Sequence, residues 1–193
     1  MKRQHLIDSI QPGDIVFIRV ANFLYRRVGT ATASWTTHVG FIDGKENGEW
    51  QVAESTFPRS KRGSFSAFLA RSENGQFGVR RIRRTLNEED LQAMRMASEA
   101  RMGRWYDARF DFDRGGLYCS KFVYQVFKEA LDEEVGQVES FRQLLDRTPD
   151  APRTFWRFWF FGRIPWQQRT VTPASQWLDE RLITVGSWGV SSR

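Results

Sequence analysis

The stretch Gly115-Gly116-Leu117-Tyr118-Cys119-Ser120-Lys121-Phe122-Val123-Tyr124-Gln125-Val126-Phe127 decides how the rest of the chain is interpreted. It contains the single cysteine of the 193 residues. From this cysteine onwards the apolar residues recur at the spacing of one helical face, whereas the two glycines before it interrupt any preceding element. We therefore predict a helix with Cys119 in its first turn, on the same face as Phe122, Val123, Val126, Phe127, Ala130 and Leu131.

The position of Cys119 has two chemical interpretations. Backbone N–H groups at the start of a helix have no acceptor within it, and together with the helix dipole they favour the thiolate, the reactive form of cysteine. A lone cysteine on an apolar helical face is also a common small packing residue. The choice between a nucleophile and a packing residue depends on whether the chain brings a base to the same place.

A predicted β-hairpin supplies such a base. Residues 38–43 and residues 49–54 are two strand-like runs, separated by a loop of residues 44–48 that contains two glycines. In that register His38 lies opposite Glu54 on one face of the hairpin, with Cβ atoms about 5 Å apart. A carboxylate beside a buried histidine orients the imidazole and makes it more basic. Cys119, His38 and Glu54 are then a candidate nucleophile, base and orienting residue.

Each of these residues also has a structural interpretation. His38 is then a satisfied buried histidine, and Glu54 is a carboxylate paired with one of the many arginines. A zinc site of Cys119, His38 and Glu54 is a third arrangement, but the chain lacks the paired cysteine and histidine spacings of the common zinc sites. We expect no metal and no cofactor, and we assign no role to the other histidine, His5.

The remaining pattern predicts an α+β fold. Strands are expected at residues 15–20 and 77–83, and helices at residues 21–28, 64–71 and 140–145. A further helix is expected to follow residues 85–88 and to end at Gly103. Residues 85–88 have the spacing of a capping box, and Thr172-Pro173 has the pattern of an N-cap followed by the first residue of a last short helix. Helices and strands are segregated rather than alternating. No repeat or linker divides the chain, so we expect one domain over residues 1–193.

The charge of the chain permits an anionic partner. The formal net charge is +6, which is compatible with binding to nucleic acid or to a membrane surface. The densest basic cluster, residues 80–84, has the pattern of a strand with exposed arginines. No common nucleic-acid-binding motif is found. We therefore expect a solvated basic face and no specific nucleic-acid partner.

Two segments bear on the compartment. The first eight residues carry charge but no apolar run of the signal-peptide type. The aromatic run of residues 155–161 is interrupted by Arg157 and is too short to span a bilayer. We expect a cytoplasmic protein with Cys119 as a free thiol, in contact with membranes peripherally at most.

Four short segments resemble the permuted papain-like amidase family: Pro12-Gly13-Asp14-Ile15-Val16-Phe17, His38-Val39-Gly40-Phe41-Ile42, Ala53-Glu54-Ser55 and Tyr118-Cys119-Ser120-Lys121-Phe122-Val123-Tyr124. This family is related to the NlpC-type cell-wall hydrolases and to lecithin:retinol acyltransferase. Residues 155–166 and 171–175 resemble its YebB-like branch, so the likeness covers nearly the whole chain. The resemblance implies a circularly permuted papain-like (NlpC-type) fold, with a small antiparallel sheet or barrel packed against helices and the histidine strand before the cysteine helix.

By motif, the resemblance implies that Cys119 is the nucleophile, His38 the base and Glu54 the orienting residue. Lys121 stands where relatives outside that branch often have glutamate, which leaves the substrate class open. We predict a cysteine amidohydrolase that cleaves an amide bond, of peptide or N-acyl type, through an acyl-enzyme on Cys119. Its substrate is expected to be a small molecule, a peptide or a lipid amide.

Two alternatives to the amidohydrolase stay open. A thioester-dependent lipid acyltransferase would use the same three residues with a different acceptor. A non-catalytic, basic binding module would use none of them. The sequence does not indicate the oligomeric state.

Overall fold

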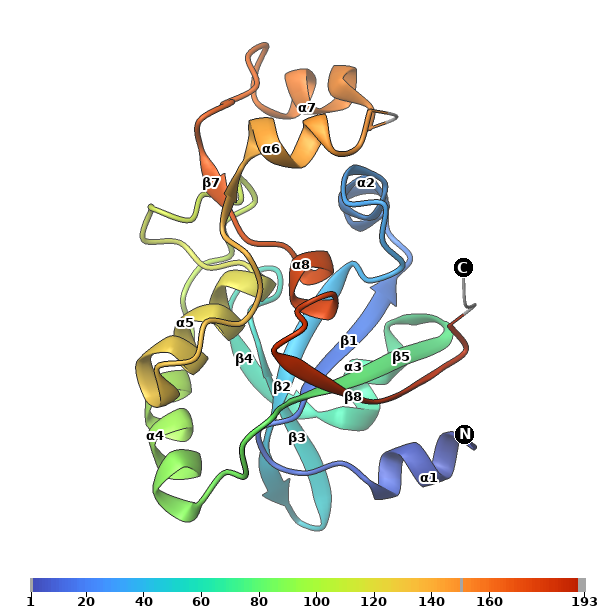
Figure 1. Ribbon diagram of the computed structural model, residues 1–193, viewed down its shortest axis with the longest axis vertical. Helices are drawn as coiled ribbons and strands as arrows, with labels where there is room; N and C mark the ends of the chain where they lie inside the picture. Colours follow the sequence, from blue (N-terminus) through green and yellow to red (C-terminus); the bar gives the residue numbers. More distant parts are fainter. Residues whose placement is uncertain (1, 150, 191–193) are drawn as a thin grey trace.

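The computed structural model describes residues 2–149 and 151–190. Its centre is a sheet of six strands in the order β4-β3-β2-β1-β5-β8, in which every neighbouring pair is antiparallel (Figure 1). The strands are β1 (Ile15–Val20), β2 (His38–Glu46), β3 (Glu49–Glu54), β4 (Lys61–Ser64), β5 (Ser72–Ile82) and β8 (Leu182–Trp188).

Helices surround this sheet, and a second, two-stranded sheet joins β6 (Glu139–Ser140) to β7 (Arg169–Thr170). The helices are α1 (Arg3–Asp8), α2 (Phe23–Ala31), α3 (Phe65–Ala70), α4 (Glu88–Glu99), α5 (Cys119–Leu131), α6 (Phe141–Asp146), α7 (Arg153–Trp159) and α8 (Pro173–Trp177). The predicted fold class, an α+β fold with an antiparallel sheet packed against helices, is confirmed. One domain remains our proposal, supported by the pairing of the C-terminal strand β8 with β5 in the central sheet.

The central strand β1 is buried on both faces of the sheet. Its apolar run therefore does not alternate with polar residues. Phe17 belongs to a cluster that includes Phe122 and Val126 of α5, whereas Val16 belongs to a cluster that includes Phe68 of α3. The helix that begins at Cys119 and the short helix α3 thus pack against opposite faces of one sheet.

The β2–β3 hairpin differs from the sequence prediction. Strand β3 has the predicted bounds, but β2 continues past residue 43 to Glu46, which pairs with Glu49. The loop is only Asn47-Gly48, where both φ angles are positive at 50° and 81°, as in the tight turns that fit the twist of a hairpin. The register shifts between Ile42 and Gly44, as at a β-bulge. The predicted five-residue loop of residues 44–48 is therefore wrong.

This correction changes which residue lies opposite Glu54. Val52 pairs with Ile42, whereas the predicted register paired Val52 with Gly40, which is two residues away along β2. His38 is consequently not directly opposite Glu54. Because side chains alternate between faces with a period of two, a shift of two leaves His38 and Glu54 on the same face. The two side chains still meet, diagonally across the hairpin.

Other elements differ less from expectation. The Asn87 side chain caps α4 by accepting from the Asp90 N–H, and the Asp90 carboxylate accepts from the Asn87 N–H in return. This cap lies two residues after the predicted one, Thr85. Strand β5 begins at Ser72 rather than at residue 77. The predicted N-cap and proline of α8, Thr172 and Pro173, are confirmed. The short strand β4, the strand β8 and the helix α7 were not expected.

The C-terminal segments pack above one end of the sheet, where α6 and α7 lie near α2 (Figure 1). Trp156 of α7 is 2% exposed, whereas Phe158 and Phe161 are 82% and 89% exposed. The aromatic run therefore has one buried side and one open side. Within the described residues, none of the helices combines the length and the apolar character needed to cross a membrane.

Candidate active site

Cys119 is the first residue of α5, as predicted. The residue before it, Tyr118, is extended at φ −128° and contributes no side-chain cap to the helix. The N–H of Cys119 therefore has no acceptor within the helix and points out of its N-terminal end. Cys119 is only 3% exposed, so the thiol lies in an enclosed part of the molecule.

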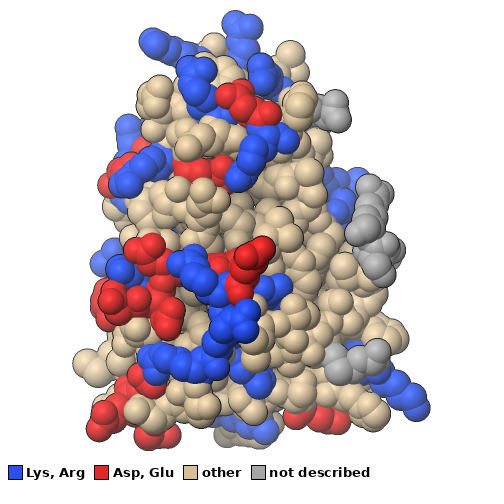
Figure 2. All heavy atoms as spheres, viewed as in Figure 1, with Lys and Arg blue, Asp and Glu red and all other residues tan. Residues whose placement is uncertain are grey.

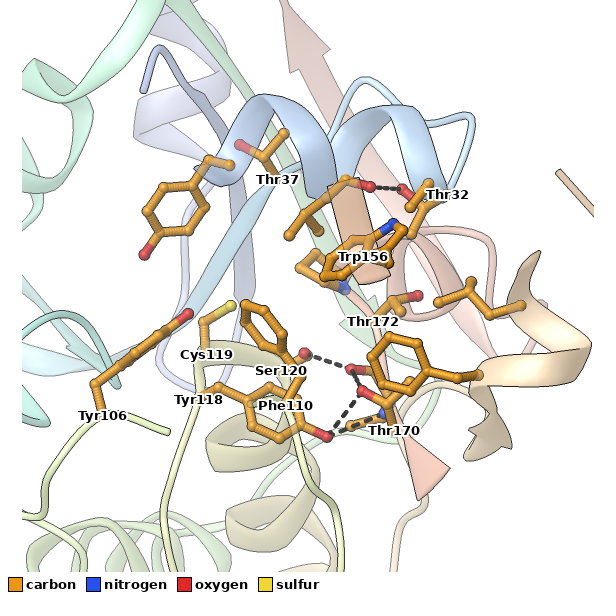
Figure 3. A pocket seen from close by; sticks show the side chains of 17 residues that line it. Thr32, Thr37, Tyr106, Phe110, Tyr118, Cys119, Ser120, Trp156, Thr170 and Thr172 are labelled. Atoms are coloured by element: carbon orange, nitrogen blue, oxygen red, sulfur yellow. Dashed lines mark hydrogen bonds between the residues drawn. The ribbon is translucent and has the colours of Figure 1, made fainter. Parts of the chain in front are cut away.

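The flanking residues fix the start of α5 to the C-terminal segment. Ser120 donates through Oγ to the carbonyl of Val171 at 2.8 Å, and the Val171 N–H donates to the Tyr118 hydroxyl at 3.1 Å (Figure 3). Gln176 of α8 donates to the carbonyl of Ser120 at 2.9 Å. Side-chain bonds on both sides of Cys119 therefore hold its backbone in one place.

Lys121 fixes the loop that leads to the helix. Its Nζ donates to the carbonyls of Asp111 at 3.1 Å and Gly116 at 2.9 Å, and also to that of Arg114. The residue is 1% exposed, and burial lowers the pKa of Lys121, an effect that the nearby Asp107 and Asp111 oppose. Lys121 therefore secures the loop that precedes the Cys119 helix.

His38 is the first residue of β2, and its ring is fully buried. Its Nε2 lies 2.5 Å from Oε2 of Glu54. The ring of Tyr25 meets the imidazole edge-on at 5.5 Å, and the ring of Phe68 lies on another side at 5.7 Å. Nδ1 is buried and has no hydrogen-bond partner of regular geometry among the described residues. Nδ1 is the nitrogen left for Cys119.

The protonation of this group follows from its neighbours. Burial alone would lower the pKa of the His38 imidazole, but the hydrogen bond and charge of Cys119, followed by those of Glu54, raise it to about 9. Burial likewise acts to raise the pKa of Glu54, yet His38 and then Arg71 hold it below its ordinary value. A charged imidazolium beside the Glu54 carboxylate is the state that these neighbours favour.

Three residues beside the candidate site, Arg71, Tyr25 and Tyr106, were not predicted, because no pattern in the sequence distinguishes them. Arg71 forms a salt bridge with Glu54 at 2.6 Å. Tyr25 and Tyr106 contribute buried phenols beside the thiol, and burial, joined by the charge of Cys119, raises the pKa of both. The hydroxyl end of Tyr106 is turned toward the Cys119 sulfur (Figure 3). This hydroxyl is buried without a hydrogen-bond partner of regular geometry among the described residues.

The sulfur of Cys119 borders a small apolar cavity of about 30 Å³ (Figure 3). This volume is sufficient to hold a water molecule. Aromatic, aliphatic and hydroxyl side chains from α2, α6, α7, the loop before α5 and the segment before α8 line it. They include Tyr25, Val28, Phe110, Phe141, Leu144, Trp156, Thr170 and Thr172.

A larger groove of about 840 Å³ adjoins this cavity. Thr32, Leu144 and Thr172 line both, so the two spaces share a wall. The groove is more polar than the cavity, and its lining includes Glu134, Gln137, Arg147, Ser175, Asp179 and Arg181. The site therefore combines a narrow apolar space at the thiol with a wider polar space beside it.

A cysteine at the start of a helix, with a histidine and a carboxylate on strands of an antiparallel sheet, is the arrangement of papain-like cysteine hydrolases. The order along this chain is permuted, because the histidine strand precedes the cysteine helix. The chain belongs to the permuted papain-like amidase enzymes of the YaeF/YiiX, C92 family, whose model matches residues 9–186. At the level of the family, the protein is a cysteine hydrolase of the amidase type.

Two relatives show the same likeness. The uncharacterized protein YiiX of Escherichia coli strain K12 is 25% identical over 175 residues, which cover 91% of this chain and 85% of that protein. The crystal structure of the metalloprotein YiiX from Escherichia coli O157:H7 matches with a TM-score of 0.82 and 25% identity, covering 90% of this chain and 95% of that one. The predicted family resemblance is confirmed.

Proposed function

We propose that the protein hydrolyses an amide bond, of peptide or N-acyl type, through a thioester intermediate on Cys119. The observation that carries this proposal is the position of the buried His38 imidazole, between Glu54 at Nε2 and the side of Cys119 at Nδ1. A thiol that acts as a nucleophile needs a base, and the base needs a third group to hold it. The three residues supply these roles.

The reaction has two halves. The Cys119 thiolate attacks the carbonyl carbon, and His38 donates its proton to the leaving nitrogen as the carbon–nitrogen bond breaks. The neutral His38 then takes a proton from water, and the hydroxide formed attacks the thioester carbon. The carbon–sulfur bond breaks, the acid product leaves and the thiolate–imidazolium pair is restored.

Two donors stabilise the oxyanion in this proposal. The Cys119 N–H at the start of α5 is the first. The Tyr106 hydroxyl is the second, because it is buried beside the Tyr25 phenol and is turned toward the sulfur. Tyr106→Phe, which keeps the ring, should lower kcat about 10²-fold. A kcat equal to that of the unmodified protein would remove Tyr106 from this role.

A lipid acyltransferase that uses the same thioester is the second candidate. The observation that favours it is the open aromatic side of residues 158–161, where Phe158 and Phe161 are exposed. Such a patch is typical of a contact with a lipid surface or with another protein. The two candidates differ only in whether water or another acceptor takes the acyl group.

The solved YiiX structure is described as that of a metalloprotein. Among residues 2–149 and 151–190 of this chain, no group of three or more His, Cys, Asp or Glu side chains is arranged to hold a metal ion. Nε2 of His38 and both oxygens of Glu54 already form hydrogen bonds with each other or with Arg71. These residues do not fit a metal site, and no step of the proposed reaction uses one.

The proposal is tested by trapping the acyl-enzyme. A small activated ester such as p-nitrophenyl acetate should release one equivalent of nitrophenol in a fast phase, and the protein should gain one acetyl group on Cys119. Cys119→Ala should show neither, while its melting temperature stays near that of the unmodified protein. Retention of the fast phase in Cys119→Ala would overturn the assignment of the nucleophile.

A further inference from the structure

Arg71 connects α3 to the candidate active site. It is the first residue after α3 and caps its C-terminus in a helical conformation. From there its Nη2 donates to Oε1 of Glu54 at 2.6 Å and to Oε2 at 2.7 Å. The Arg71 side chain is 31% exposed, whereas that of Glu54 is 3% exposed. A partly solvated cation thus reaches a buried carboxylate.

The guanidinium of Arg71 is held by two further contacts. Its Nη1 donates to the hydroxyl of Thr56 at 3.3 Å, and its Cζ lies 5.1 Å from the centre of the Phe68 ring. The same Phe68 ring contacts the imidazole of His38 at 5.7 Å. A planar cation fixed by a fork of hydrogen bonds and an aromatic face has little freedom to leave its carboxylate. Arg71, Glu54 and His38 therefore form one continuous row behind the thiol.

We propose that Arg71 is a positioning residue of the hydrolysis proposed above, on which this inference rests: it keeps the Glu54 carboxylate ionised and oriented toward His38, and so sustains the Cys119 thiolate at mildly acid pH. Two observations distinguish this from an ordinary surface salt bridge. The partner of Arg71, the Glu54 carboxylate, is buried, and its Oε2 is shared between Arg71 and His38. A surface pair has neither property and contributes little.

The consequence of removing Arg71 follows from the environment of Glu54. With His38 as its only partner, the buried carboxylate is ionised less readily, because burial penalises the charged form. A protonated Glu54 no longer stabilises the imidazolium, and the thiolate loses the partner that keeps it ionised. The pH below which the thiol stops reacting should therefore rise.

A direct effect of Arg71 on His38 has the opposite sign. A cation near an imidazolium disfavours it, so its removal alone would extend the reactive range to lower pH. Arg71 touches Glu54, however, and reaches His38 only across that carboxylate. Because Arg71 is partly exposed, water screens its longer-range repulsion of His38 more than its contact with Glu54. The effect through Glu54 should prevail.

Other charged or titratable groups near Glu54 do not replace Arg71. Helix α3 contributes none, since its sequence is Phe-Ser-Ala-Phe-Leu-Ala. Lys61 of β4 pairs with Glu54 through the backbone, but its side chain is exposed. From α2 and α5 the neighbours are the Tyr25 phenol and, through His38, the Cys119 thiol. Among the described residues that hydrogen-bond to Glu54, Arg71 is the permanent cation.

The experiment measures alkylation of the full-length protein by iodoacetamide from pH 4.5 to pH 9. Cys119 is the single cysteine, so the mass of the intact protein reports one site. Arg71→Gln should move the acid midpoint of the rate upward by about one pH unit. Arg71→Lys, which keeps the charge but not the fork, should recover part of this shift. In the presence of Glu54→Gln, adding Arg71→Gln should produce no further upward shift.

Arg81 offers a matched control. It holds another buried carboxylate, Asp14, through two bonds of 2.6 and 2.8 Å, and lies elsewhere on the sheet. Arg81→Gln should lower the melting temperature but leave the acid midpoint unchanged. If Arg71→Gln behaves in the same way, or moves the midpoint downward, Arg71 has only a structural role and the inference is wrong.

The two proposals fail in different ways. If the His38→Ala variant is alkylated as fast as the unmodified protein, the thiolate–imidazolium pair is absent. Both the proposed function and the role of Arg71 are then overturned. If alkylation depends on His38 but not on Arg71, only the inference about Arg71 fails. Should Arg71→Gln not fold at the assay temperature, Arg71→Met decides, because it keeps the aliphatic part of the side chain without its charge, and an unchanged midpoint in that variant contradicts the role.

Discussion

At the scale of single residues, the imidazole of His38 has a different neighbour on each ring nitrogen. Nε2 is held by Glu54, and Nδ1 is left on the side of Cys119. In an enzyme without bound substrate, catalytic hydrogen bonds are often long and tighten only in the complex. The absence of a regular bond at Nδ1 among the described residues is therefore compatible with a base that takes and returns a proton there.

Glu54 and His38 should act as a unit. Glu54→Gln keeps the shape of the side chain but removes the charge that stabilises the imidazolium, so kcat should fall roughly tenfold to a hundredfold while KM changes little. His38→Ala should remove most activity, and adding Glu54→Gln to it should remove little more. A double-mutant cycle measures this directly. Additive losses would return Glu54 to the role of a structural salt bridge.

At the scale of elements, the positions of β2 and β3 depend on a close approach between two strands. A Cβ atom added to Gly40 would lie 2.7 Å from Cγ1 of Val52, 2.9 Å from the carbonyl oxygen of Ala53 and 3.3 Å from Cβ of Glu54. At least one of these atoms is backbone and cannot move without moving the strand. Glycine at this position therefore lets the strand that carries Glu54 lie close to the one that carries His38.

Gly40→Ala should disturb the site without removing a functional group. We expect a loss of stability of about 1–3 kcal/mol, because the strand must shift to relieve the contact. The kcat should fall roughly tenfold, since Glu54 moves with the strand. Gly63→Ala in β4 is the control, because no atom lies within 4 Å of the added Cβ. Equal effects of the two substitutions on kcat, measured with thermal melting, would contradict this account.

The hairpin also shows what the sequence could and could not predict. Alternating residues identified both strands and the face shared by His38 and Glu54, because that face follows from a period of two. The register was not predictable in the same way, since residues 44–48 contain two glycines and either a long loop or a bulge with a tight turn fits them. A shift of two residues leaves the alternation pattern unchanged.

Contacts between residues that are distant in the sequence were harder to predict. Arg71 is one of 29 lysine and arginine residues and lies 17 positions from Glu54, so no local spacing marks it. The strand β4 has the sequence Lys-Arg-Gly-Ser, which lacks apolar alternation and is defined only by its pairing with β3. The helix of Cys119, by contrast, was predictable because its apolar stripe and preceding glycines are local signals.

At the scale of the whole molecule, basic and acidic side chains are interleaved across the face shown in Figure 2. Many are paired, as in the salt bridges of Arg84 with Asp90 and of Arg181 with Asp179. The net charge of +6 is therefore not gathered into one continuous basic patch on this face. Binding of an anionic surface to this face should be diffuse and sensitive to salt.

The aromatic side of residues 158–161 gives a second expectation at this scale. We predict weak sedimentation with anionic vesicles that high salt abolishes, because Arg157 and Arg163 interrupt the exposed apolar surface. Replacing Phe158 and Phe161 by serine should change this binding little. Sedimentation that persists in high salt and disappears in the serine variant would instead favour the lipid acyltransferase.

The central claim is that the fold joins Cys119 and His38 into a reactive ion pair, and the dependence of thiol alkylation on pH tests it most directly. In the unmodified protein, iodoacetamide should react rapidly at neutral pH, because the pKa of His38 is raised to about 9 and the imidazolium persists up to that value. As the pH rises through about 9, hydrolysis should decline, since His38 can no longer protonate the leaving group. In His38→Ala, alkylation should be slow at neutral pH and accelerate only where alkali ionises an ordinary thiol. Identical alkylation profiles for the two proteins would contradict the account.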